Sequence, residues 1–182
     1  MNRANTSLAA GACTLLLGAC AGMSGAKMAP VDNAALPAPV RVPAGESQKM
    51  WTVGAGEITY ECREKKDAAG QYEWAFVAPV ATLRDGGGTV VGKYYAGPTW
   101  ESMDGSKVTA KQVAVAPQPA GNLPLQLVKA EPATGMGSMQ GVTYIQRLNT
   151  KGGVAPAMAC DAMSKGKRQQ VAYEADYVFY GM

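Results

Sequence analysis

The sequence predicts an all-β fold, an antiparallel β-sandwich or small barrel with at most one short helix. Three observations support this fold class. After Gly56, short runs of aromatic and β-branched residues alternate with turns rich in glycine, aspartate and proline. Apolar side chains recur at every second position from Val171 to Phe179, as in a strand with one buried face. No long segment shows helical periodicity, so an antiparallel sheet is the expected architecture.

The expected strands follow one another along the chain with tight turns between them. In the second strand Tyr72, Trp74 and Phe76 share one face. Asp104-Gly105 is the clearest of the turns. We expect one helical turn, near residues 156–163. The strands are predicted at residues 58–63, 72–77, 89–95, 100–103, 107–115, 123–127, 142–148 and 171–179.

Residues 1–19 have the parts of a secretory signal peptide, with a positive charge at Arg3, an apolar core, and small residues before the cleavage point. Cys20 follows directly, as the modified cysteine does in bacterial lipoproteins. We therefore expect acyl chains such as palmitate on Cys20, and two or more chains anchor a protein stably in a membrane. An ordinary cleaved leader, or processing at Cys13, is the alternative interpretation.

The rest of the chain divides into a tether and one domain. Residues 20–43 are rich in alanine and proline and lack an apolar pattern, which is typical of an extended tether. Residues 44–182 then form a single β-rich domain. Ala21 follows Cys20, and an alanine at this position, rather than an acidic residue, favours location in the outer membrane. We expect a lipid-anchored protein of the cell envelope, in the outer membrane and facing the periplasm.

The absence of histidine excludes several kinds of site. A Ser-His-Asp triad, a Cys-His dyad and zinc sites built on histidine all require this residue. We expect no metal and no cofactor, and a metal site would have to use carboxylates and carbonyls. The formal charge is +3 and falls to +2 when the leader is removed, because Arg3 is its only charged residue. Nucleic acid is therefore not an expected partner.

Cys62 and Cys160 are the two cysteines of the expected domain. An isolated pair in an oxidising compartment usually forms a disulfide. The closed loop of about 100 residues would stabilise the fold by roughly 4–5 kcal/mol. Two free thiols are the alternative.

The segment from Tyr94 to Glu101 is the most distinctive part of the sequence. Gly97-Pro98 interrupts a strand, because proline cannot donate to the sheet ladder. The resulting bend gathers Tyr94, Tyr95, Trp100 and Glu101, which would suit a sugar or peptide ligand. The alternative is a packed corner in which the rings fill the core.

Glu101, Asp104 and Arg147 are further candidate contacts. The two carboxylates would hydrolyse glycosides if they faced each other across a cleft. Solvated turn acids are the simpler interpretation. Arg147 lies in an apolar strand and would bind an anion or a carboxylate, or would pair with Asp161 or Asp176.

Four groups of residues recur together in one known family. They are Tyr60-Glu61-Cys62; residues 95–101 with Asp104-Gly105-Ser106; residues 146–153 with Ala155-Pro156 and Cys160; and residues 173–177 with Phe179-Tyr180. In combination they resemble the domain-of-unknown-function family 3455 of secreted bacterial and fungal proteins. The resemblance runs from about Leu36 to Met182 and implies a secreted β-rich domain, a Cys62–Cys160 bridge and no established activity.

These observations favour a non-enzymatic binding or interaction module without catalytic residues. Its expected partners are the membrane, through the lipid anchor, and an envelope protein or glycan. A hydrolase that uses carboxylates such as Glu101 and Asp104 is one alternative function. An inhibitor of a cell-wall enzyme is another.

Overall fold

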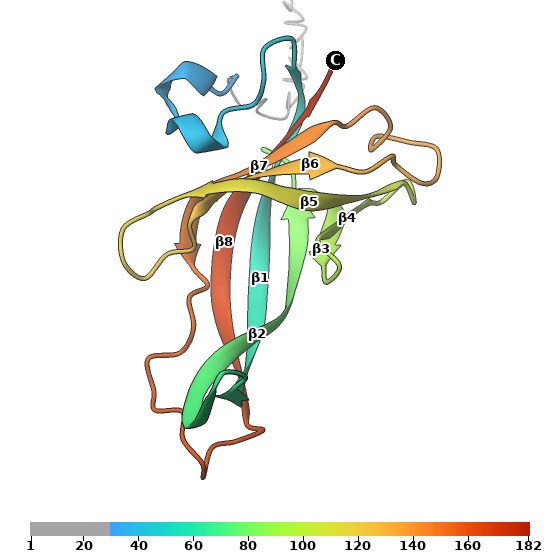
Figure 1. The fold of residues 1–182 in the computed structure, drawn as a ribbon. Helices are drawn as coiled ribbons and strands as arrows, with labels where there is room; N and C mark the ends of the chain where they lie inside the picture. Colours follow the sequence, from blue (N-terminus) through green and yellow to red (C-terminus); the bar gives the residue numbers. More distant parts are fainter. Residues whose placement is uncertain (1–29) are drawn as a thin grey trace, which may run out of the picture.

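The computed structural model describes residues 30–182 and is built around one antiparallel sheet of eight strands. Each strand pairs with its sequence neighbours, and β8 pairs with β1, so the sheet closes into a ring (Figure 1). The predicted leader and Cys20 lie outside the described residues. The strands are β1 (Ser47–Lys65), β2 (Ala68–Arg84), β3 (Val90–Tyr95), β4 (Thr99–Ser102), β5 (Lys107–Ala116), β6 (Leu125–Ala130), β7 (Tyr144–Gly152) and β8 (Arg168–Gly181).

The predicted all-β class is confirmed. The only helical segments in the described part of the chain are two 3-10 turns, η1 (Asn33–Ala35) and η2 (Ala38–Val40). The helical turn expected near residues 156–163 is wrong, because bends, irregular backbone and the start of a hydrogen-bonded turn from Asp161 to Ser164 occupy that range. The segment is held to β1 instead: Cys160 is bonded to Cys62, and the N–H of Gly166 donates to the carbonyl of Cys62 at 2.8 Å.

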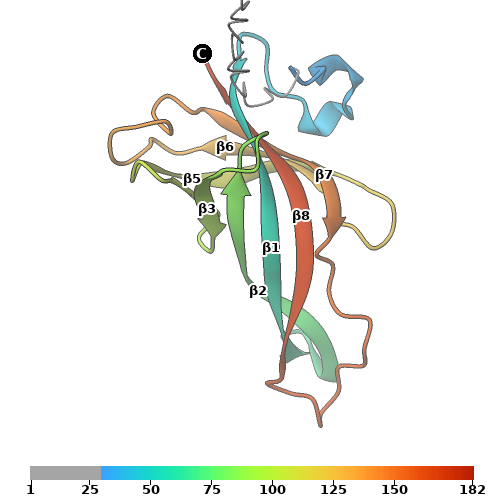
Figure 2. The same ribbon diagram turned by 180° about the vertical axis from the view of Figure 1, so that it is seen from behind.

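Three strands are much longer than the rest and give the molecule its shape. β1, β2 and β8 extend beyond the ring at one end, where the β1–β2 hairpin and the loop before β8 lie (Figures 1 and 2). At the opposite end, near the C-terminus and residues 30–46, the strands β5, β6 and β7 run across the direction of the three long strands. No helix of the described residues is long and apolar enough to cross a membrane.

The inside of the ring is the main hydrophobic core. Side chains alternate between the two faces of each strand, so every second residue points inward. Trp100, Ile145 and Phe179 are among the largest fully buried side chains of this core. Aromatic rings occupy its centre, and Trp100 contacts both Tyr177 and Phe179 edge-on.

A second core covers the outside of the ring. Val40 and Val42, from the segment predicted as the end of the tether, pack on outward-facing residues of β5 to β8. Val40 is 0% exposed. The amide of Gln146 donates to the carbonyl of Val40 at 2.6 Å and accepts from the Tyr180 hydroxyl at 2.8 Å. Ordered packing therefore begins before residue 44, because these residues shield the apolar outer face of the sheet from water.

Candidate functional site

The predicted bend splits into an inner and an outer half. It connects β3 to β4, and alternation along these strands turns Tyr94 and Trp100 inward. Both are buried, with ring centroids 4.8 Å apart. Tyr95 and Glu101 lie on the outer side. The bend therefore does not gather its side chains on one surface, and Trp100 belongs to the core.

Glu101 is the centre of a small outer network. The Tyr95 hydroxyl donates to its carboxylate at 2.7 Å, and the ammonium groups of Lys93 and Lys107 each lie 3.3 Å away. The hydrogen bond from Tyr95 and the two lysines lower the pKa of Glu101. The same hydrogen bond raises the pKa of Tyr95. Glu101 is thus a charged carboxylate whose acceptor positions are in use.

Asp104 joins two loops. One carboxylate oxygen accepts from the backbone N–H and hydroxyl of Ser106 at 2.9 and 2.5 Å. The other accepts from the backbone N–H and hydroxyl of Ser138, both at 2.8 Å. These bonds, led by the Ser106 hydroxyl, hold the pKa of Asp104 well below its usual range. A glycosidase acid needs a raised pKa, so the contacts of Glu101 and Asp104 do not favour a catalytic pair.

Arg147 points into the ring from β7. It lies directly opposite Tyr177 of β8 and Gln126 of β6. Its guanidinium donates to the carbonyl of Pro124 through Nε at 3.3 Å and through an Nη at 3.0 Å. Among residues 30–182 it forms no ion pair. Asp161 and Asp176, the acids considered as partners from sequence, accept instead from Ser164 and Asn149.

Four tyrosines surround this arginine, and we call the set of Tyr60, Tyr94, Tyr173, Tyr177 and Arg147 the tyrosine–arginine cluster. The rings of Tyr94 and Tyr177 are 5.1 Å apart, and the hydroxyls of Tyr173 and Tyr177 are 3.3 Å apart. The Tyr60 hydroxyl donates to the carbonyl of Gly153 at 2.8 Å. The structure thus brings together Tyr94 and Arg147, two residues predicted from sequence.

Burial sets the protonation state of this cluster. It raises the pKa of all four tyrosines, while the nearby positive charge of Arg147 lowers it. Burial has the larger effect, so the hydroxyls stay neutral at physiological pH and act as hydrogen-bond donors. The cluster therefore presents one fixed positive charge among neutral hydroxyl groups.

Glycine makes room for the cluster. A Cβ at Gly54 of β1 would lie 2.5 Å from the ring of Tyr177, which no side chain tolerates. Sequence reasoning missed Tyr60, Tyr173 and Tyr177 as partners of Arg147. The alternation of the last strand did place Tyr173 and Tyr177 on one apolar face. That alternation gave no information on which other strand would face Tyr173 and Tyr177.

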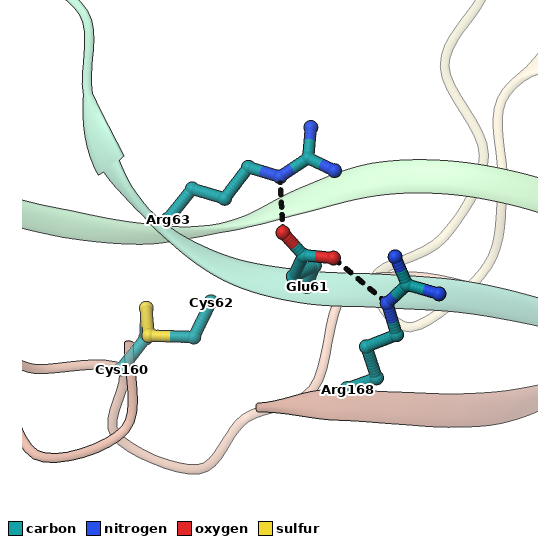
Figure 3. Close-up of polar contacts among 5 residues, drawn as sticks. All are labelled: Glu61, Cys62, Arg63, Cys160 and Arg168. Carbon is teal, nitrogen blue, oxygen red and sulfur yellow. Dashed lines mark hydrogen bonds and ion pairs between the residues drawn. A yellow bond between two sulfur atoms is a disulfide. The ribbon is translucent and has the colours of Figure 1, made fainter. Parts of the chain in front are cut away.

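The predicted disulfide is present at the end of the molecule where β1 finishes. Cys62 and Cys160 are bonded across a sequence separation of 98 residues. Beside the bridge, the carboxylate of Glu61 accepts from Nε of Arg63 at 2.8 Å and from Nε of Arg168 at 2.7 Å (Figure 3). These two bonds lower the pKa of Glu61 to about 2. The bridge and the paired charges fix the loop before β8 on β1.

The sequence of the chain matches one protein family. The family described as "Protein of unknown function (DUF3455)" matches residues 43–181. The chain belongs to the DUF3455 family. No curated protein and no solved structure matches it. The family match includes all eight strands of this DUF3455 domain and begins just after Val42. The segment that covers its outer core therefore precedes the family region.

The candidate site of this DUF3455 domain is the tyrosine–arginine cluster. Among residues 30–182, no three histidine, cysteine, aspartate or glutamate side chains come together as metal ligands. The predicted lipid attachment at Cys20 lies outside the described residues. The cluster can offer hydrogen bonds and a positive charge to a ligand, which is the chemistry of anion binding.

Proposed function

We propose that this DUF3455 chain is a non-enzymatic binding module whose tyrosine–arginine cluster holds a carboxylate or another small oxyanion. The observation that carries the proposal is Arg147, which faces the inside of the ring without an acidic partner among the described residues.

Charged side chains inside a protein are normally paired, because taking an ion out of water is costly. Arg147 is only partly exposed and makes hydrogen bonds to one carbonyl oxygen, that of Pro124. A guanidinium has several more N–H donors, arranged as a fork that matches a carboxylate or phosphate. An oxyanion on these donors would supply the missing negative charge.

The tyrosines complement such a ligand. The hydroxyl of Tyr60 already donates to Gly153, and the neutral hydroxyls of the other three tyrosines can donate to a ligand. The low dielectric of the ring interior strengthens hydrogen bonds to an anion. Tyr94 lies within ring contact of Tyr177, directly across from Arg147. Raised pKa values keep these hydroxyls protonated near neutral pH, so little phenolate is present to act as a base and the arrangement favours binding over proton abstraction.

The proposed location at the cell envelope limits the range of candidate ligands. A lipid anchor on Cys20 would hold the module at the envelope membrane, as the sequence before that residue suggests. Glycans of the cell envelope that carry carboxylates are accessible there. We therefore propose an acidic glycan fragment as the physiological source of the anion.

A thermal-shift titration tests the binding site. Inorganic phosphate, sulfate, simple carboxylates and acidic sugars would be added to the full-length chain and to the variants Arg147→Gln and Arg147→Lys. A ligand at about 100 times its Kd stabilises by about 2.7 kcal/mol, which for a chain of this size raises Tm by roughly 5–10 °C. We expect this rise in the wild type, a smaller rise in Arg147→Lys and none in Arg147→Gln.

Arg168→Gln is the matched control, because Arg168 is an exposed arginine at the far end of β8. It should keep the full ligand response. The proposal is wrong if no anion in the panel raises Tm, or if a folded Arg147→Gln variant responds like the wild type.

A further inference from the structure

A pocket of about 440 Å³ opens at the end of the ring where β1 and β3 begin and β2 and β4 end. Three methionines line it: Met50 of β1, Met103 in the turn after β4, and Met139 in the loop before β7. We call this the methionine pocket. It shares no residue with the tyrosine–arginine cluster.

Asp104 and Ser138 hold the two methionine-bearing loops together. Ser138 precedes Met139 and donates its backbone N–H and its hydroxyl to the carboxylate of Asp104, which follows Met103. The backbone N–H of Met139 also donates to the Ser106 hydroxyl at 3.1 Å. These hydrogen bonds therefore hold the turn that carries Met103 against the loop that carries Met139.

The close approach of these loops also explains one glycine. A Cβ at Gly137 would lie 2.4 Å from the carboxylate of Asp104, so a side chain there would push the loops apart. One glycine, two serines and one aspartate therefore serve to join two short loops: Gly137, Ser106, Ser138 and Asp104. Each of these loops brings one methionine to the same pocket.

Core packing accounts for only part of this arrangement. Met139 is 2% exposed and fills space in the inner core. Met103 is 73% exposed, so packing does not explain an apolar side chain at that position. The wall of the pocket also includes Thr52, whose buried hydroxyl has no hydrogen-bond partner among the described residues.

Thioether sulfur is a soft ligand, and soft ligands select Cu(I) among the common biological metals. Residues 30–182 offer no competing histidine or thiolate, because the chain has no histidine and Cys62 and Cys160 are joined in a disulfide. Two carboxylates, those of Asp85 and Asp104, lie at the same pocket and favour a cation there.

We propose that the methionine pocket binds one Cu(I) ion through the thioethers of Met50, Met103 and Met139. The ion enters and leaves as Cu(I), so no electron is transferred. This site does not depend on the function proposed for Arg147.

Silver is the first probe, because Ag(I) resembles Cu(I) in its ligand preference and is not redox-active under these conditions. Ag(I) would be titrated into the full-length chain carrying ¹³C-methyl methionine and the changes Cys13→Ser and Cys20→Ser, so that no free thiol competes for the ion. We expect the methyl signals of Met50, Met103 and Met139 to shift, saturating at one equivalent. Those of Met158 and Met163, in the loop before β8, should stay in place. Shifts that miss the three pocket methionines would overturn the proposal.

Cu(I) affinity is then measured by anaerobic competition with a chromophoric Cu(I) chelator. Met103→Leu keeps the size of the exposed side chain and removes the sulfur, so folding should not change. We expect it to weaken binding at least about tenfold, or about 1.4 kcal/mol. Met163→Leu, at an 86% exposed methionine outside the pocket, is the control and should bind like the wild type. Equal affinities for both variants, or no binding by the wild type, would show that these methionines only pack.

Discussion

At the scale of single residues, three carboxylates of the domain are held in the charged state by nearby donors. Tyr95, Lys93 and Lys107 lower the pKa of Glu101, and serine hydroxyls and backbone N–H groups lower that of Asp104. For Glu61 the donors are the side chains of two arginines. In each case the carboxylate connects separate parts of the chain. The same interactions that join strands and loops thus make these acids unsuitable as proton donors.

Glu61 gives a pH-dependent prediction. Its pKa is lowered from about 4.5 to about 2 in the folded protein. Because the folded pKa is the lower one, the contribution of Glu61 to stability is present above about pH 4.5 and is lost as the pH falls toward 2. We expect Glu61→Gln to unfold at lower urea concentration than the wild type at pH 7, and this difference should shrink steadily below pH 4.5.

The control for this experiment is Glu57→Gln, at an exposed residue of the same strand that makes no ion pair in the described part of the chain. Its difference from the wild type should be small at every pH. A constant difference for Glu61→Gln between pH 7 and pH 2.5 would contradict the linkage.

At the scale of elements, local sequence patterns predicted where the strands lie. They failed at strand boundaries that depend on packing against residues distant in the sequence. The alternation from Val171 to Phe179 is a local property, and it located the centre of β8. The prediction began β1 too late, because Gly54 and Gly56 look like turn residues in sequence, and it ended β2 too early, before Pro79. In the structure Gly56 is required inside β1, since its Cβ would lie 2.0 Å from the carbonyl oxygen of Val80.

The candidate site was predictable only in part for the same reason. Tyr94 and Arg147 were singled out by residue type, but their common neighbour Tyr177 comes from another strand pairing. The sequence also could not show that Trp100 faces inward, because one residue of register decides the face of every side chain in a strand. The closed ring is what brings β3, β7 and β8 around one interior.

The N-terminal segment gives a prediction about an element. Val40 is fully buried on the outer face of the sheet although the sequence around it looks like a tether. Val40→Ala removes two methyl groups and leaves a cavity, so we expect a loss of about 1.5–3 kcal/mol in the free energy of unfolding. Urea denaturation measures this loss. Val113→Ala, on the exposed side of β5, should change stability by less than about 0.5 kcal/mol. Equal effects of the two variants would mean that the segment does not stabilise the ring.

At the scale of the whole molecule, the two ends of the ring are built differently. Residues 30–46 enter at the end where the C-terminus lies, and the Cys62–Cys160 bridge closes the opposite end (Figures 1 and 2). An anchor on Cys20 would therefore hold the first end toward the membrane. The hairpin and the bridged loop would point away from it, and the methionine pocket, beside Met50, would lie on the membrane side.

This arrangement depends on the anchor, which gives the last prediction. The apolar leader ends in Leu17-Gly18-Ala19 directly before Cys20, while Cys13 interrupts the apolar core and makes a poorer attachment site. Cys20→Ser should abolish acylation and either release the domain from the membrane fraction or stop processing of the leader. Cys13→Ser should leave both unchanged. Fractionation of cells and intact mass of the mature protein measure the two effects. If the wild type carries no acyl mass and Cys20→Ser still fractionates with membranes, something other than a lipid on Cys20 holds the protein there.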